Sequence, residues 1–259
     1  IVIIVLIASS VSSNQISFVS IGDWGGASID LDHARWENTV ARTFSDTASK
    51  INPSFTVAVG LEAYDDEVLR FHVNKGFTTK QWHSAVQMLR DNNLRVKTYL
   101  LFKPPFMSEG DALVHTTSWL NEVAQYSDEV SVNPMNIQKN TIVDRLFRNK
   151  EYRPPWLWSL VEMIMSSHEH LGDDSCRIIV HPTAGGKIRG AHNCGECDRD
   201  VVAAIERYSV SGDTEEFSHL ECSCKSHWRA EIENDNSFPI PLGFGTFRRG
   251  NPTDIVRAP

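Results

Sequence analysis

Two patterns of apolar positions alternate along the chain. Short apolar runs rich in β-branched and aromatic residues predict buried strands, whereas longer stretches with apolar residues three and four apart predict helices. The predicted strands are residues 16–22, 53–60, 95–102, 129–134 and 176–182. The predicted helices are residues 33–51, 63–73, 78–93, 109–126, 140–150, 159–171 and 199–210. Strands that alternate with helices predict βαβ units and a mainly parallel sheet, so the fold class is α/β.

Polar residues fall where the predicted strands end. They are Asp23, Glu62, Lys103, Asn133, Asn136 and His181. Ligands of parallel α/β folds bind at the carboxyl ends of the strands. The sequence therefore predicts that this edge of the sheet carries the chemistry.

The first eight residues, IVIIVLIA, are wholly apolar and are followed by SSVSSNQ. This order is typical of a secretory signal peptide, which would make the protein secreted. The alternative is a buried first strand, because short apolar runs of β-branched residues fit that too. The run is too short to span a bilayer, and no other segment predicts a membrane span.

The overall charge argues against a general attraction to nucleic acid. The chain has 259 residues and a formal net charge of -8, so RNA contact requires a local basic patch. One candidate is DRLFRNKEYRPPWLW, residues 144–158, where Arg145, Arg148, Lys150 and Arg153 stand among aromatic residues. Basic side chains bind RNA phosphates and aromatic rings stack on unpaired bases. The alternative is a solvated helix that runs into a packed Pro–Trp corner.

A second candidate is HPTAGGKIRGAHN, residues 181–193. Glycines beside Lys187 and Arg189 can bind an anion through backbone N–H groups and positive charge. The alternative is an ordinary surface loop.

Four of the five cysteines occur in two close pairs. Cys194 and Cys197 form C-x-x-C, and Cys222 and Cys224 form C-x-C beyond a predicted helix. Four thiolates brought together predict a structural zinc site, with an iron–sulfur cluster as the alternative. Disulfides or buried free thiols remain open, although C-x-C pairs disulfide-bond poorly. His181 or His192 could replace one thiolate, and Cys176 is predicted to be a core residue.

Near the start of the chain, SFVSIGDWGG (17–26) and INPSFTVAVG (51–60) resemble the opening of a purple acid phosphatase. That resemblance implies a metal-binding role for Asp23 and Tyr64. Leu61 stands where that family has its bridging aspartate. A metallophosphoesterase is therefore one alternative function.

A longer resemblance covers residues 58 to about 235. It rests on VGLEAYDDEVLRFHVNKGFT, VKTYLLFKPPFMSEGDA, IIVHPTAGGKIRGAHNCGECD and LECSCKSHWRAE. These stretches resemble the later part of the archaeal radical SAM protein that completes archaeosine in tRNA, a distant relative of the Elongator catalytic subunit. The resemblance implies a partial parallel (β/α) barrel followed by a cysteine-rich metal module. It also implies a cytoplasmic protein that acts on tRNA, with a partner tRNA-modifying subunit as a further possibility.

The same resemblance implies roles for particular residues. Glu62, Lys103, Asn133 and Asn136 would face S-adenosylmethionine or substrate, and the four paired cysteines would form the C-terminal metal site. The reaction would cleave a C–N bond of a lysine-modified 7-deazaguanine. The family holds a [4Fe–4S] cluster with a C-x3-C-x2-C motif, which this sequence lacks because its first cysteine is Cys176.

Together these features predict a chimeric chain. Its parts are a signal-like segment (1–15), a phosphatase-like segment (16–60), a partial radical SAM barrel (61–180), a cysteine-rich module (181–236) and an irregular tail (237–259). The leading hypothesis is a truncated radical SAM tRNA-modification protein. The alternatives are a metallophosphoesterase and a zinc-stabilised RNA-binding module without catalysis.

Overall fold

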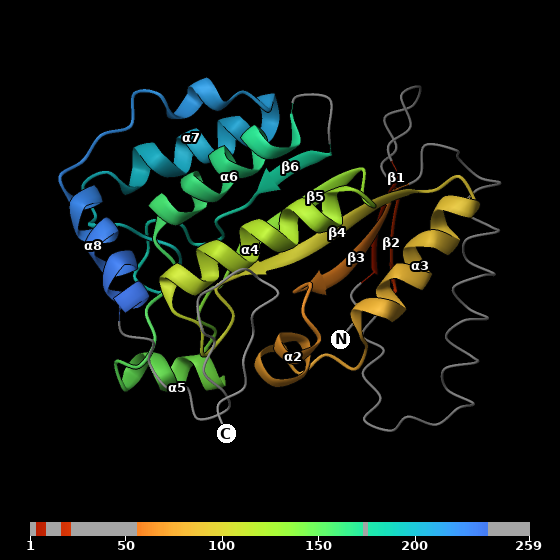
Figure 1. Cartoon of the computed structure of the whole chain (residues 1–259), viewed down its shortest axis with the longest axis horizontal. Helices are drawn as coiled ribbons and strands as arrows, with labels where there is room; N and C mark the ends of the chain where they lie inside the picture. The colour runs from red at the N-terminus through yellow and green to blue at the C-terminus, as the bar shows by residue number, and fades with distance from the viewer. Residues whose placement is uncertain (1–3, 9–16, 22–55, 173–175, 238–259) are drawn as a thin grey trace.

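A computed structural model describes residues 4–8, 17–21, 56–172 and 176–237 (Figure 1). In this part of the chain six strands form one sheet in the order β2-β1-β3-β4-β5-β6. The strands are β1 (Ile4–Ala8), β2 (Ser17–Ile21), β3 (Thr56–Glu62), β4 (Arg95–Phe102), β5 (Glu129–Pro134) and β6 (Arg177–Val180). β3 to β6 are parallel, whereas β1 is antiparallel to both of its neighbours.

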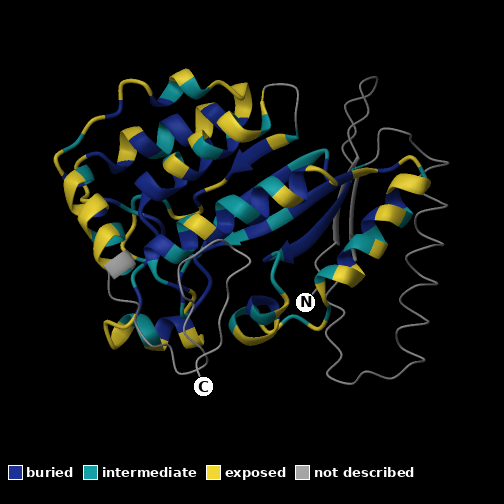
Figure 2. Ribbon diagram, viewed as in Figure 1, coloured by how far each residue is buried: buried dark blue, intermediate teal, exposed yellow. Residues whose placement is uncertain are grey.

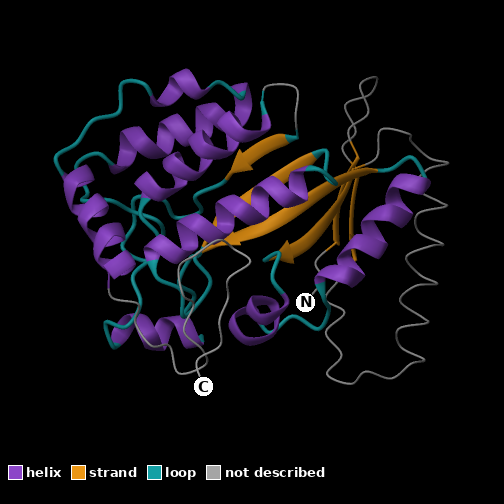
Figure 3. Cartoon of the chain, in the orientation of Figure 1, coloured by secondary structure: helices purple, strands orange, loops and turns teal. Residues whose placement is uncertain are grey.

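Helices connect the parallel strands (Figure 3). They are α2 (Asp66–Val68) with the π-helical turn η1 (Leu69–Val73), α3 (Thr79–Asp91), α4 (Glu109–Ala124), α5 (Ile142–Arg148), α6 (Leu157–Leu171), α7 (Asp198–Ser211), the 3-10 turn η2 (Thr214–Phe217) and α8 (Cys224–Ser237). Thr78 begins α3 with a capping box, in which its hydroxyl and the Gln81 side chain bond each other's backbone N–H groups. The predicted parallel α/β sheet and its cysteine-rich C-terminal region are confirmed.

The core lies between the sheet and a layer of helices. Val96, Leu100 and Phe102 alternate along β4 and are fully buried, as are Val130 and Val132 of β5. Alternate residues of a strand share one face, so these side chains form a single apolar surface. Figures 1 and 2 show α4, α6 and α7 side by side over the sheet.

Several predictions concern the start and end of the chain. The apolar run agrees with its strand alternative, because Ile4–Ala8 forms β1 between β2 and β3. The signal-peptide interpretation has no support here. The predicted helix 33–51 and the tail beyond residue 237 lie outside the described residues. Among the helices that are described, none is both long and apolar enough to cross a membrane.

Candidate metal centre

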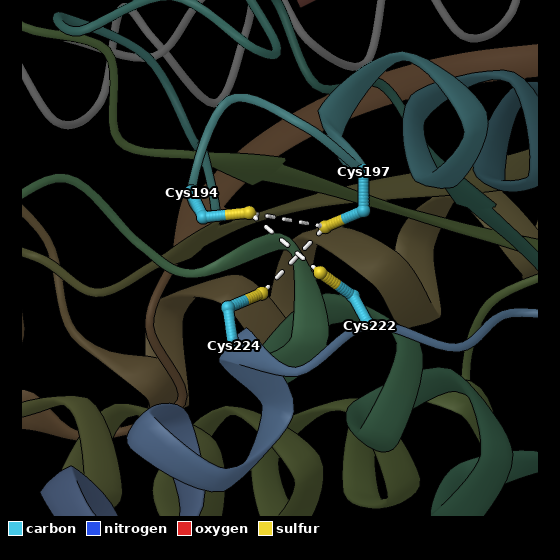
Figure 4. A group of neighbouring side chains, drawn as sticks. All are labelled: Cys194, Cys197, Cys222 and Cys224. Atoms are coloured by element: carbon cyan, nitrogen blue, oxygen red, sulfur yellow. Dashed lines mark hydrogen bonds between the residues drawn. The ribbon is translucent and has the colours of Figure 1, made fainter.

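The two cysteine pairs meet in space. Figure 4 shows the sulfurs of Cys194, Cys197, Cys222 and Cys224 pointing toward one common centre. All four Sγ atoms lie within 4.8 Å of one another. The separations are 3.9 Å for Cys194–Cys197, 3.7 Å for Cys194–Cys222 and 3.7 Å for Cys197–Cys224. Four thiolates at this spacing form a group that could hold a metal ion.

Local structure fixes the first pair. Asp198, in the first turn of α7, accepts hydrogen bonds from the backbone N–H groups of Asn193 (2.9 Å) and Gly195 (3.1 Å). Gly195 has φ 96°, a conformation that favours glycine. The carboxylate therefore folds the loop that carries Cys194 back onto the start of α7, where Cys197 lies.

Two of the sulfurs accept hydrogen bonds from buried side chains. Trp158 Nε1 lies 3.2 Å from Cys224 Sγ, and Asn193 Nδ2 lies 3.3 Å from Cys197 Sγ. Both cysteines are buried, whereas Cys194 is exposed. Partners of this kind orient metal ligands and tune their basicity.

The thiols differ in acidity. Backbone N–H groups, that of Cys197 foremost, lower the pKa of the Cys194 thiol to about 7. Burial raises the pKa of Cys224 to about 11 and raises that of Cys197 as well. A bound cation would displace the protons, so metal affinity should fall in acid.

The cysteine group is continuous with the main core. Cys197, Cys224 and Trp228 lie in the same hydrophobic cluster as the strands, and Trp228 Nε1 donates to Ser159 Oγ of α6 at 2.8 Å. The predicted boundary at residue 180 therefore crosses a shared core. The proposed histidine ligands stand apart from this group: His192 Nδ1 contacts the Gly190 carbonyl oxygen at 2.8 Å.

The strand-end residues do lie at one edge of the sheet, because β3, β4 and β5 are parallel neighbours. Two of them form ion pairs with the protein. Glu62 Oε1 lies 3.3 Å from Lys75 Nζ, and Lys103 Nζ lies 2.7 Å from Glu109 Oε2. Asn133 and the neighbouring Asn136 are half-buried at and just beyond the end of β5. No contact in the structure tests their predicted role toward S-adenosylmethionine or substrate.

The six basic residues predicted to contact RNA separate into two groups. Arg145, Lys150 and Lys187 are exposed. Arg148 and Arg189 both bind the carboxylate of Asp144, at 2.8 Å and 2.6 Å. Arg153 stacks on Trp156 and donates to the carbonyl oxygens of Pro154, His192 and Asn193, so its guanidinium is engaged within the fold.

The predicted anion loop uses its backbone donors internally. The N–H groups of Gly185, Gly186, Lys187 and Gly190 all donate to carbonyl oxygens of the same segment, residues 182–191. The prediction that its glycines offer N–H groups to a phosphate is therefore wrong. The charge of Lys187 is what this loop presents to solvent.

The phosphatase-like residues are not brought into any described site. Asp23 lies outside the described residues. The Tyr64 hydroxyl lies 2.7 Å from His83 Nε2, against a cluster of aromatic rings.

Comparisons with known proteins decide between the two resemblances. The chain is 33% identical over 195 residues to archaeosine synthase subunit beta of Methanosarcina acetivorans, a match that covers 74% of this chain and 55% of that protein. It is 37% identical over 181 residues to the protein of the same name from Thermococcus kodakarensis, covering 70% of this chain and 55% of that protein. The larger part of this chain is homologous to archaeosine synthase subunit beta. The resemblance to the archaeosine-forming protein is thus confirmed, and the purple acid phosphatase resemblance and the chimera find no support.

The match to archaeosine synthase subunit beta is partial, since the chain spans about half the length of the curated relatives it matches. A third relative, an uncharacterized protein of Methanocaldococcus jannaschii, is 31% identical over 192 residues and covers 72% of this chain and 51% of that protein. No family model matches the chain. Among solved structures, an N-terminally deleted Elp3 of Methanocaldococcus infernus has 13% identity and a TM-score of 0.44, covering 60% of this chain and 35% of that chain.

The residues that surround the cysteines could not be identified from sequence. Trp158 and Asn193 bond to the sulfurs but resemble any core tryptophan or loop asparagine in the sequence. Asp198 carries the one available signal, since an acidic residue directly after C-x-x-C at a helix start is suited to cap the preceding loop.

Proposed function

We propose that this chain acts in tRNA modification as a relative of archaeosine synthase subunit beta, with a structural zinc ion bound by its four paired cysteines. The observation that carries the proposal is the identity of 33% and 37% to two proteins of that name over about 70% of the chain. A tRNA substrate would place the protein in the cytoplasm. The reaction of the family, C–N bond cleavage on a modified 7-deazaguanine, is part of this proposal.

The spacing of the sulfurs favours one ion over a cluster. With a zinc–sulfur distance of 2.3 Å, tetrahedral geometry separates the sulfurs by about 3.8 Å. The three closest Sγ pairs are 3.7 to 3.9 Å apart. In a [4Fe–4S] cluster each thiolate binds a different iron, which moves the sulfurs further from one another. Because the cysteines would fill all four positions, the zinc would be structural.

The residues present do not fit a radical SAM cluster. The sequence has no C-x3-C-x2-C motif, and four of its five cysteines belong to the proposed zinc site. We therefore derive no radical step for this chain. S-adenosylmethionine and a [4Fe–4S] cluster would need ligands on another polypeptide, and a partner tRNA-modifying subunit is part of the proposal.

The exposed cations supply a surface for tRNA. Arg145, Lys150 and Lys187 are exposed on α5 and the adjoining loops, and the Arg189–Asp144 contact holds these segments together. We propose that these side chains contact phosphates. Arg148 and Arg189 would support them from Asp144.

Elemental analysis of anaerobically purified protein tests the metal. One zinc per chain is expected, with loss in Cys194→Ser/Cys197→Ser and retention in the control Cys176→Ser, whose sulfur lies outside the group. Iron instead of zinc would reject the structural assignment.

Binding of tRNA, measured over a series of salt concentrations, tests the function. Salt-sensitive tRNA binding supports a role in modification, and modification of tRNA in the presence of a partner would separate an enzyme subunit from a binding module. Zinc-loaded protein that binds no tRNA would contradict the proposal.

A further inference from the structure

The cysteine centre and the carboxyl end of β4 are joined by a continuous series of contacts. Lys103 directly follows β4 and has φ 57°, an uncommon conformation for a residue with a side chain. Its ammonium lies 2.7 Å from Glu109 Oε2, and the two side chains are 5% and 0% exposed. Tyr152 donates its hydroxyl to the Lys103 carbonyl oxygen at 2.8 Å. Lys103 is thus held in one position by its side chain and its backbone.

Glu109 uses its other oxygen to hold the start of α6. Its Oε1 accepts the backbone N–H of Trp156 at 2.9 Å. The Trp156 indole Nε1 in turn donates to Glu231 of α8 at 2.8 Å, and the Arg153 guanidinium lies 3.9 Å from the ring centre. Glu109 therefore connects β4, α6 and α8.

From this point the contacts reach both cysteine pairs. Arg153 donates to the carbonyl oxygens of His192 (2.9 Å) and Asn193 (3.3 Å), the two residues before Cys194. Helix α8, which carries Glu231, begins at Cys224. It also holds the first turn of α4, where Gly110 N–H donates to Asp235 at 3.1 Å. A movement of either cysteine pair would be transmitted to Glu109.

We infer that Glu109 is a positioning residue through which the metal-bound cysteine centre holds Lys103 at the ligand-binding edge of the sheet. A buried carboxylate that keeps both of its partners is stable, whereas one that loses a partner is strongly destabilised. Loss of the metal releases the His192–Asn193 segment and the start of α8, so the Glu109 contacts loosen and Lys103 becomes accessible. The inference rests on the proposed occupancy of the cysteine centre.

Chemical acetylation of lysines, followed by mass spectrometry, measures this directly. The full chain is labelled with and without its metal, which is removed by a chelator. Acetylation of Lys103 should rise about tenfold or more on metal removal, because labelling follows local opening. Lys97 is the internal control: it is also buried and ion-paired, with Glu129, but lies in the amino-terminal half of β4. Its labelling should stay constant.

Two variants separate this role from general stability. Glu109→Gln should give high Lys103 labelling with the metal still bound. Glu231→Gln, on a half-buried position, should raise it partly and serves if the first variant does not fold. Unchanged Lys103 labelling in metal-free, folded protein would overturn the inference, as would an equal rise at Lys97. Elemental analysis of the same samples shows separately whether metal binds, which distinguishes this outcome from failure of the zinc assignment.

Discussion

The indole Nε1 of Trp158 lies 3.2 Å from the sulfur of Cys224, and both residues are buried. The bond joins the first turn of α6 to the first residue of α8. Asn193 makes the equivalent contact to Cys197 at 3.3 Å. The centre thus has a buried half with hydrogen-bonded sulfurs and an accessible half with the exposed Cys194.

Trp158→Phe should weaken metal binding. Phenylalanine keeps most of the apolar volume but removes the N–H group that bonds the sulfur, and loss of such a partner typically costs about 10- to 100-fold in affinity. Competition with a chromogenic zinc chelator measures the change. Trp82→Phe is the matched control, because the Trp82 Nε1 is buried without a hydrogen-bond partner among the described residues. Equal affinities in the two variants would contradict the prediction.

Gly190→Ala should destabilise the loop that precedes the cysteines. A Cβ atom there would lie 2.2 Å from the Ala184 carbonyl oxygen, so the backbone would have to move. We expect a loss of about 1–3 kcal/mol in the free energy of unfolding, as for other overpacked sites. Gly76→Ala is the control, since nothing lies within 4 Å of the added atom. Urea denaturation compares the two, and similar midpoints would show that the loop adapts.

Asp144 should contribute a pH-dependent part of the stability. Hydrogen bonds from Arg189 foremost, then from Asn140 N–H and Arg148, hold its pKa at about 2, below the usual 3.8. Because the folded-state pKa is depressed, the stabilisation is complete above about pH 4 and is lost as the pH falls through about 2. The difference in unfolding midpoint between the wild type and Asp144→Asn should therefore be constant near neutrality and shrink below about pH 4.

Denaturation of both proteins at several acidic pH values tests this. In Arg189→Gln, which removes the largest cause of the shift, the loss should begin at higher pH. A difference that stays the same at pH 3 and pH 6 would count against the role of Asp144.

The sequence predicted the elements better than their partners. The strand 95–102 coincides with β4, because β-branched and aromatic alternation is a local property. The cysteine group was predictable since spacing alone indicates it. By contrast, the partners of Arg153 and Arg189 come from segments about 40 residues away, so their charges suggested RNA contacts while the structure engages them internally. Helix α8 was missed because its polar sequence offers few apolar positions.

Arg145 and Lys150 should supply part of the affinity for tRNA. Each phosphate contact releases condensed counterions, so removing one lowers affinity for all tRNA sequences and reduces the slope of log affinity against log salt by about 1. Arg145→Gln/Lys150→Gln should therefore reduce the slope by about 2 and leave zinc content unchanged. Lys80→Gln on α3, an exposed cation on a different helix, is the control. Filter binding over a series of salt concentrations gives the slopes. If the double variant keeps the wild-type slope, tRNA does not contact α5. If Lys80→Gln lowers the slope by as much as one α5 substitution does, the binding is a general charge effect and the assigned surface is wrong.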